Sequence, residues 1–114
     1  MADLHDPVEL EPWSAVLAEH ERLLPDQLEY LAERSAFYRR RFEEWGVDPG
    51  HVTTLEALRE LPFTAKDDER AAQADAPPSR PLGEHQAAPT AALNRVIYTS
   101  GTTGRPTYFG LTER

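Results

Sequence analysis

The segment that most restricts the fold is a short glycine- and threonine-rich stretch, GTTGR at residues 101–105, set between two apolar runs. The flanking runs, LNRVIYTS at 93–100 and PTYFGLT at 106–112, are rich in β-branched and aromatic residues. Such runs favour β-strands, and glycine and threonine are common in the turns between strands. The pattern therefore predicts a hairpin over residues 93–114, and a plain turn is one interpretation of its loop.

The same loop also contains the groups that bind a phosphate. Phosphates bind where several backbone N–H groups point at one spot, which requires conformational freedom, supported by hydroxyls and a cation. Gly101 and Gly104 supply the freedom, and Arg105 supplies the charge. On the residues alone, a phosphate site and a plain turn are about equally supported. The hydroxyls belong to Thr99, Ser100, Thr102 and Thr103.

The loop does not fit the common nucleotide-binding motifs. The Walker pattern G-x-x-x-x-G-K-[ST] lies between a strand and a helix. Here the second glycine follows only three residues after the first, no lysine comes after it, and a strand is expected next. The dinucleotide pattern G-x-G-x-x-G is absent as well. A phosphate site in this segment would therefore have a strand–loop–strand geometry.

Residues 13–75 are predicted to be helical, after a loose acidic lead-in over residues 1–12. An apolar stripe with helical spacing begins at Trp13, and Pro25 interrupts it. Because proline lacks the N–H that a helix interior uses, we expect either a break at Pro25 or a second helix beginning there. Ser35 is placed to cap a further helix, and Gly46 is placed to end it. The stripe consists of Trp13, Val16, Leu17, His20, Leu23 and Leu24.

The helix expected after Ser35 carries an aromatic cluster and three consecutive arginines. The arginines at 39–41 alternate with Glu43 and Glu44, which favours a solvated face of ion pairs over a phosphate or nucleic-acid patch. The aromatic residues have the spacing of one helix face and are interpreted as core: Phe37, Tyr38, Phe42 and Trp45.

Two short helices are predicted next, with a tight bend between them. The patterns Thr53-x-x-Glu56 and Thr64-x-x-Asp67 both fit the capping box that begins a helix. The first of these helices is expected to end at the Leu61–Pro62 step, because the residue before proline is driven out of the helical conformation.

Three further interpretations concern residues outside these patterns. Lys66, the only lysine, is interpreted as a surface or structural residue. Residues 76–92 are rich in proline and have no period, so they are predicted to form a loop. His85 is the one histidine of this polar loop and is expected to be solvated.

Length and composition limit the classes of protein. At 114 residues the chain is one small domain at most, and the absence of cysteine excludes disulfides, cysteine-based zinc sites and a thiol nucleophile. No secretory signal or apolar run of membrane-spanning length is present, so a cytoplasmic location is expected. The net charge of −8 argues against nucleic acid and anionic membranes as partners. Residues 1–75 carry −10 and residues 76–114 carry +2, which suits an anionic ligand at the hairpin.

The stretch YTSGTTGRPT closely resembles the phosphate-loop signature of the adenylate-forming superfamily, which includes acyl-CoA synthetases, luciferases and the adenylation domains of peptide synthetases. The blocks SAFYRRRFEEWGVDP, LEALRELPFTAKDDERA and PTYFGLT resemble, in order and spacing, the N-terminal region of the phenylacetate–coenzyme A ligase family. The resemblance covers about Leu28 to the C-terminus. That family usually has lysine at the position of Arg105 and proline at that of Ala36, whereas other branches often have lysine at the position of Thr107.

The resemblance implies a fold and a site. The chain is expected to be α+β, with N-terminal helices followed by a β-hairpin, the start of the large N-terminal α/β domain of an adenylate-forming enzyme. The residues implied to hold the β- and γ-phosphates of ATP are Ser100, Gly101, Thr102, Thr103, Gly104 and Arg105. Family members use ATP and Mg²⁺ to convert a small aromatic or aliphatic carboxylate into an acyl-adenylate, and then transfer the acyl group to coenzyme A.

The resemblance also implies that this chain is the N-terminal fragment of a larger ligase. The family's adenine-binding segments, acidic Mg²⁺ ligand, carboxylate pocket and catalytic lysine all lie further along the sequence, so neither a catalytic nor a metal-binding residue is assigned here. The 114 residues alone are expected to be inactive. Two alternatives stay open on the sequence: a non-catalytic helical interaction module, and a degenerate remnant of such a ligase.

Overall fold

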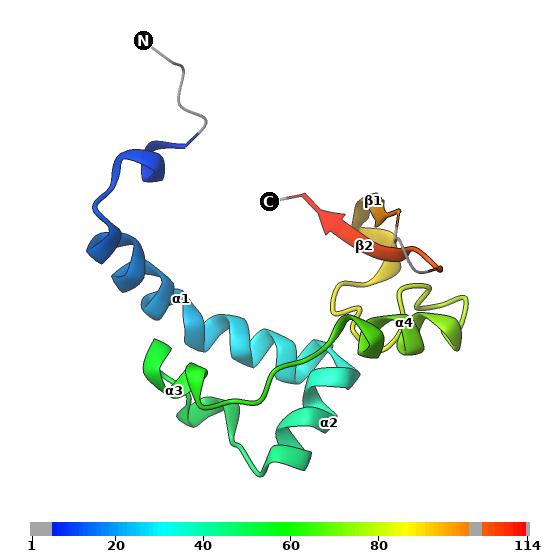
Figure 1. The fold of residues 1–114 in the computed structure, drawn as a ribbon, viewed down its shortest axis with the longest axis horizontal. Helices are drawn as coiled ribbons and strands as arrows, with labels where there is room; N and C mark the ends of the chain where they lie inside the picture. Colours follow the sequence, from blue (N-terminus) through cyan, green and yellow to red (C-terminus); the bar gives the residue numbers. More distant parts are fainter. Residues whose placement is uncertain (1–5, 101–103, 114) are drawn as a thin grey trace.

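The computed structural model describes residues 6–100 and 104–113, in which α-helices are followed by one antiparallel hairpin (Figure 1). The predicted α+β order is confirmed. The helices are α1 (Trp13–Arg34), α2 (Ala36–Trp45), α3 (Leu55–Arg59) and α4 (Lys66–Ala74), and the strands are β1 (Leu93–Thr99) and β2 (Thr107–Thr112). Short 3₁₀ turns lie at Pro7–Leu10 (η1), Pro49–His51 (η2) and Thr90–Ala92 (η3).

Helix α1 runs through Pro25 without a break, so the expectation of a break or a new helix there is wrong. Pro25 itself is exposed, whereas Leu24 and Leu28 of the same helix are 8% and 5% exposed. An interior proline costs a helix about 3 kcal/mol. Burial of the two leucines, each worth about 2 kcal/mol, offsets that cost.

The core lies where α2 and α3 pack against the second half of α1 (Figure 1). Its buried members are Leu24, Leu28, Phe42 and Val52. Tyr38 and Trp45 pack against this cluster, and Phe37 is 2% exposed, so the aromatic face of α2 is core as predicted. The first half of α1 extends away from this core, and Trp13 is 66% exposed.

Helix α2 begins and ends as its sequence predicts. The hydroxyl of Ser35 accepts a hydrogen bond from the backbone N–H of Tyr38, which satisfies one of the free donors of the first turn. Gly46 ends the helix in the left-handed conformation, at φ 64°, where a side chain would be strained.

The two predicted capping boxes are each wrong by one residue. Thr54, not Thr53, caps α3 by accepting from the N–H of Ala57. Helix α4 begins after Ala65, whose N–H donates to the carboxylate of Asp68 at 2.9 Å. The shift turns Asp68 toward Arg41 of α2 at 2.9 Å, a tertiary contact that the local pattern does not encode.

The proline-rich loop is ordered against the N-terminus of α2. The carbonyl of Glu84 accepts hydrogen bonds from the Ser35 hydroxyl and the Phe37 N–H. Gln86 is buried; its amide oxygen accepts from Leu82 N–H, and its nitrogen donates to the Ala88 carbonyl and the Thr90 hydroxyl. These bonds replace the ladder hydrogen bonds that the segment lacks.

His85 is not solvated, which corrects the expectation from the sequence. Its ring stacks on Phe37 with centroids 3.7 Å apart, and Tyr38 meets its edge. The loop geometry imposed by Glu84 carries the imidazole onto the aromatic face of α2. Burial lowers the pKa of His85 below its ordinary value of about 6.5.

The three arginines of α2 only partly form the predicted solvated face. Arg40 and Arg41 both pair with Glu44 on the same helix, as expected. Arg39, however, donates to the carbonyls of Ala32 and Glu33 at the end of α1. Arginine at this place satisfies carbonyls that a helix terminus leaves free. Within the described part of the chain, no helix is both long enough and apolar enough to cross a membrane.

Candidate phosphate-binding site

The hairpin brings both ends of the predicted phosphate loop together. β1 and β2 pair antiparallel, and Thr99 lies opposite Thr107 at the end next to the loop. Gly101, Thr102 and Thr103 lie outside the described residues. Of the other predicted site residues, Ser100 follows β1, and Gly104 and Arg105 precede β2.

Gly104 has the backbone freedom that a phosphate loop requires. Its φ is 132°, a conformation that residues with a side chain rarely adopt. A Cβ at this position would have no atom of the described residues within 4 Å, so the backbone geometry favours glycine here. Ser100, Gly104 and Arg105 are all exposed, and their polar groups are accessible to a ligand.

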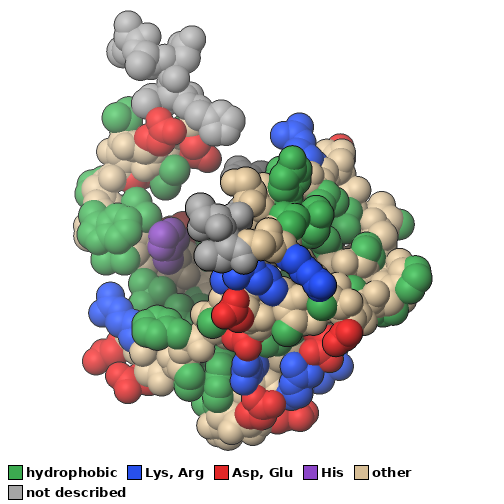
Figure 2. All heavy atoms as spheres, turned by 45° about the vertical axis from the view of Figure 1, so that its right-hand side comes forward, with side chains coloured by type: hydrophobic (Ala, Val, Ile, Leu, Met, Phe, Trp, Pro, Cys, Tyr) green, Lys and Arg blue, Asp and Glu red, His purple; other side chains and the backbone are tan. Residues whose placement is uncertain are grey.

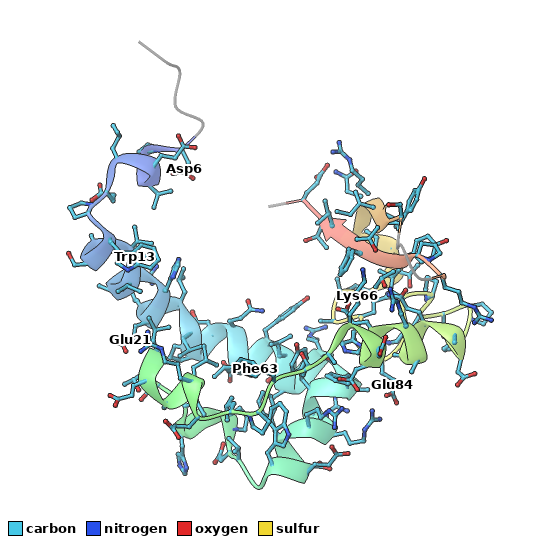
Figure 3. The ribbon with its side chains drawn as sticks, in the orientation of Figure 1. Asp6, Trp13, Glu21, Phe63, Lys66 and Glu84 are labelled. Carbon is cyan, nitrogen blue, oxygen red and sulfur yellow. The ribbon has the colours of Figure 1, made fainter. Side chains whose placement is uncertain are left out.

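Helix α4 contributes a second cation at the loop end of the hairpin. Figure 3 shows Lys66 at the start of α4, below the strands, where its Nζ donates to the Thr99 hydroxyl at 3.0 Å. The sequence interpretation of Lys66 as a surface or structural residue did not include a contact with the hairpin. Lys66 stands out in the sequence as the only lysine. Its contact with Thr99, however, joins residues 33 positions apart, and no local sequence pattern predicts such a contact.

Arg70 of α4 and Arg105 of the loop line a common hollow of about 240 Å³. Arg70 is held by Asp67 at 3.1 Å, and its Nε is buried without a hydrogen-bond partner among the described residues. Figure 2 shows several Lys and Arg side chains close together on this face of the molecule, with Asp and Glu side chains beside them. Cations from two distant segments therefore lie at one end of the hairpin. The other residues that line the hollow are Gln73, Ala74, Pro106 and Tyr108.

Helix α4 also contacts the strand that follows the loop. The amide nitrogen of Gln73 donates to the Tyr108 carbonyl at 2.9 Å, and the Tyr108 N–H donates to the Gln73 amide oxygen at 3.1 Å. Next to it, Thr107 is fully buried, and its hydroxyl has no hydrogen-bond partner among the described residues.

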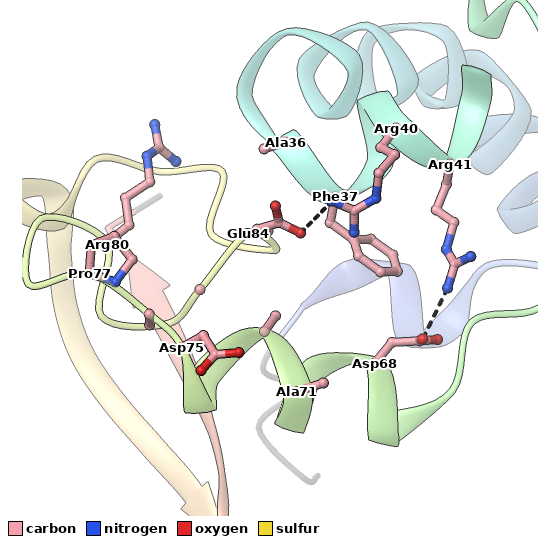
Figure 4. Close-up of a pocket in the computed structure, with 13 residues that line it drawn as sticks. Ala36, Phe37, Arg40, Arg41, Asp68, Ala71, Asp75, Pro77, Arg80 and Glu84 are labelled. Atoms are coloured by element: carbon pink, nitrogen blue, oxygen red, sulfur yellow. Dashed lines mark hydrogen bonds and ion pairs between the residues drawn. The ribbon is translucent and has the colours of Figure 1, made fainter. Parts of the chain in front are cut away.

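Helix α4 is itself held to α2 by one ion pair, and a second ion pair joins α2 to the proline-rich loop. Figure 4 shows Arg41 bonded to Asp68 at 2.9 Å and Arg40 bonded to Glu84 at 2.7 Å. The pKa of Asp68 is lowered, first by the hydrogen bond from the Ala65 N–H and also by Arg41. Asp68 is therefore ionised at neutral pH, and its charge keeps the two helices together.

A metal site is not formed by the described residues, which contain no group of three or more histidine, aspartate or glutamate side chains in ligating positions. The cluster at the hairpin is cationic, so the ligand that it suits is an anion.

Curated proteins similar to this chain are phenylacetate-coenzyme A ligases. The chain is 39% identical over 102 residues to the protein of Thermus thermophilus and 34% identical over 110 residues to that of Pseudomonas putida. The alignments cover 90% and 96% of the chain, but 21% and 23% of these relatives. The chain therefore spans about a fifth of their length. No protein-family model matches it.

Similar solved structures are those of a 2-hydroxyisobutyryl-CoA ligase. One, in complex with 2-HIB-AMP and CoA, has a TM-score of 0.73 and is 35% identical to this chain. The structural alignment covers 89% of this chain and 21% of the 2-hydroxyisobutyryl-CoA ligase chain. Another, with 2-HIB-AMP in the postadenylation state, also has a TM-score of 0.73, at 32% identity.

The described helices and hairpin thus have the fold of the N-terminal part of an adenylate-forming CoA ligase. Within that class the chain is related in sequence to the phenylacetate-coenzyme A ligases. Both findings confirm the resemblance carried by the loop and helix motifs.

Proposed function

We propose that this chain supplies the ATP phosphate-binding loop of a carboxylate–CoA ligase, which forms an acyl-adenylate and then an acyl-CoA thioester. The observation that carries the proposal is the arrangement at the end of the hairpin. There the two ends of the glycine-rich loop come together, and Lys66 of α4 bonds Thr99 at the end of β1. The relatives and structural neighbours, all named as CoA ligases, support it.

In this proposal the loop holds the β- and γ-phosphates of ATP. Ser100 and Gly104 offer a hydroxyl and an accessible backbone, and Arg105 offers a guanidinium. Gly101, Thr102 and Thr103 belong to the same proposed set through the sequence motif alone. Arginine binds phosphate oxygens through a planar fork, so the geometry would differ from that of the lysine usual in the family.

The chemical need for such a loop follows from the reaction. A carboxylate oxygen of the acid attacks the α-phosphorus of ATP, the bond from that phosphorus to the bridging oxygen breaks, and pyrophosphate leaves with the electron pair. Cations and N–H groups fixed around the β- and γ-phosphates stabilise the charge that develops on pyrophosphate. We assign this role to Arg105, with Lys66 as a second cation.

We assign no described residue of this chain to the second half-reaction. The sulfur of coenzyme A attacks the carbonyl carbon of the acyl-adenylate, the bond from that carbon to the AMP oxygen breaks, and the thiol proton is released. Mg²⁺ is implied by the resemblance, but the described residues do not form a ligand set for it. None of them is therefore proposed as a metal ligand.

The substrate that we propose is a small aromatic or aliphatic carboxylic acid. Phenylacetate is the first candidate because the curated relatives are named for it, whereas the structural neighbour is named for 2-hydroxyisobutyrate. The sequence expectation of a cytoplasmic enzyme is part of the same proposal.

The surface of the hairpin supports a larger parent protein. Figure 2 shows hydrophobic side chains on the surface beside the loop. The exposed members are Val96, Ile97, Tyr98, Tyr108 and Leu111, between 43% and 67% exposed. A two-stranded sheet is marginal in water. Coverage of this surface by further residues would stabilise it, and this supports the proposal over a self-contained helical module.

The test uses the full-length product of the gene that encodes this chain. Purified protein is incubated with ATP, Mg²⁺, coenzyme A and phenylacetate or other small acids, and nucleotides and thioesters are separated by chromatography. We expect AMP, pyrophosphate and one acyl-CoA in equal amounts. Formation of ADP and phosphate, or no thioester with any acid, would contradict the proposal.

A further inference from the structure

Gln73 is the only described residue of α4 whose side chain bonds the backbone of β2 in both directions. Its carboxamide accepts from the N–H of Tyr108 and donates to the carbonyl of the same residue. In an antiparallel pair, residues alternate between pointing both backbone groups at the partner strand and pointing both away. The two groups of Tyr108 point away from β1, and Gln73 satisfies both of them.

This contact reproduces the hydrogen bonding of a neighbouring strand. A carboxamide has the same donor and acceptor as a peptide group, and glutamine can present both on one side. β2 is the edge strand on that side of the described two-stranded sheet. Helix α4 therefore takes the place of a third strand at one residue, at the end of the sheet next to the loop.

The bonded residue is close enough to the loop to set its geometry. Between Arg105 and Tyr108 lie only Pro106, whose φ is fixed by its ring, and Thr107, which is fully buried. The φ of Pro106 is therefore restricted, and Thr107 is enclosed by its neighbours. Fixing the backbone of Tyr108 therefore restricts the position of Arg105, three residues earlier in the chain.

The other strand is held by the same helix. Lys66 bonds Thr99 at the end of β1, and Thr99 lies opposite Thr107. Helix α4 thus forms hydrogen bonds with both strands at their loop ends. The Asp68–Arg41 ion pair holds α4 itself against α2. Of these contacts, only that of Gln73 involves a neutral side chain of α4. An effect of Gln73 on the loop therefore comes from the position of the backbone and not from charge.

We propose that Gln73 is a positioning residue for Arg105 of the phosphate loop, acting through the backbone of Tyr108, and that it sets the affinity for ATP. The inference rests on the proposed function in that the loop is taken to bind ATP. Gln73 does not itself contact the nucleotide in this proposal.

The test compares Gln73→Ala and Gln73→Glu in the full-length protein, with ATP as the varied substrate. Alanine removes both hydrogen bonds. Glutamate keeps an acceptor for the Tyr108 N–H but places a carboxylate oxygen against the Tyr108 carbonyl. We expect the KM for ATP to rise about tenfold in Gln73→Ala and at least as much in Gln73→Glu, with kcat changed less than about twofold.

Gln27→Ala is the matched control. It makes the same substitution on a helix, at an exposed glutamine of α1 outside the hairpin and the loop. It should leave the KM for ATP unchanged. A second readout is amide hydrogen exchange of the Tyr108 segment in the full-length protein without ATP, which should accelerate in Gln73→Ala and not in Gln27→Ala.

The outcomes separate this inference from the function on which it rests. If the wild-type protein makes no thioester and no AMP, the proposed function fails, and faster exchange at Tyr108 would still show that Gln73 holds the strand. If the wild type is active and the KM for ATP in Gln73→Ala equals that of Gln27→Ala, the positioning role is overturned. Loss of stability with an unchanged KM would overturn it in the same way.

Discussion

At the scale of single residues, the charge at the end of the hairpin comes from segments far apart in the sequence. Arg105 belongs to the loop, whereas Lys66 and Arg70 belong to α4. Arg70 and Arg105 line one hollow, whereas Lys66 bonds the Thr99 hydroxyl at the end of β1. Asp67 offsets the charge of Arg70, with which it pairs at 3.1 Å, whereas Asp68 is paired with Arg41 of α2.

His85 is a residue whose environment sets a pH response. Its ring is stacked on Phe37, and its Nδ1 is buried without a hydrogen-bond partner among the described residues. A proton added at that nitrogen would have no acceptor. The charged groups around the ring are mixed: Asp68 and Glu84 favour protonation, and Arg40 and Arg41 oppose it. Burial is the larger effect and lowers the pKa of His85.

The lowered pKa predicts a loss of stability in mild acid. Below its ordinary pKa of about 6.5 the unfolded chain binds a proton at His85 that the folded chain does not bind. The free energy of unfolding should therefore fall as the pH drops below about 6.5, by at most about 1.4 kcal/mol per pH unit. Above that pH, His85 is neutral in both states and contributes no slope.

Urea unfolding of the 114-residue chain at pH 7.5 and 5.5 checks this prediction. His85→Phe keeps an aromatic ring on Phe37 and removes the titrating group, so it should reduce the difference in stability between the two pH values. His51→Gln, at a histidine side chain that is 86% exposed, is the control. An equal pH difference in the wild type and in His85→Phe would contradict the assignment.

At the scale of elements, the proline-rich loop and α4 approach each other closely enough to require a glycine. Gly83 has a φ of 80°, and a Cβ there would overlap the backbone carbonyl of Ala72 in α4. Gly46 also has a positive φ, of 64°, but an added Cβ would meet no atom within 4 Å. A substitution at Gly46 therefore measures the cost of the left-handed conformation alone, and one at Gly83 adds the cost of close packing.

Gly46→Ala should cost about 1 kcal/mol of unfolding free energy, which is the cost of a left-handed backbone for a residue with a side chain. Gly83→Ala should cost at least about 2 kcal/mol, because backbone atoms of α4 would have to move as well. Chemical denaturation followed by circular dichroism measures both values. Equal losses in the two variants would show that the loop and α4 do not pack as described.

The elements also show which parts of the structure were predictable. Helix α2 was predictable from Ser35 to Gly46, because its caps are local signals, and so was the hairpin, because its apolar runs flank a turn. The continuity of α1 through Pro25 was not, because it depends on leucines buried by α2 and α3. The start of α4 at Ala65 was not predictable either. Asp68, and not Asp67, accepts the capping hydrogen bond, and it is held there by its long-range ion pair with Arg41.

At the scale of the whole molecule, the sequence identified half of the candidate site. The loop was recognisable as a contiguous motif, with Ser100, Gly104 and Arg105 at one end of the hairpin. The contribution of α4 was not, since Lys66 and Gln73 meet the strands only through long-range contacts. The structure thus adds, to a motif already visible in the sequence, a helix that bonds both strands next to the loop.

The central claim is that this loop holds the phosphates of ATP in a carboxylate–CoA ligase. The most direct test is carboxylate-dependent exchange between ATP and pyrophosphate in the full-length protein, without coenzyme A and with ATP varied. Arg105→Ala and Lys66→Met should each raise the KM for ATP about tenfold or more, because each removes a charged contact to phosphate. Two exposed arginines away from the loop provide the matched controls, Arg95→Ala on β1 and Arg59→Met on α3, and should leave it unchanged. Exchange that is absent, or a KM for ATP that Arg105→Ala does not alter, would contradict the claim.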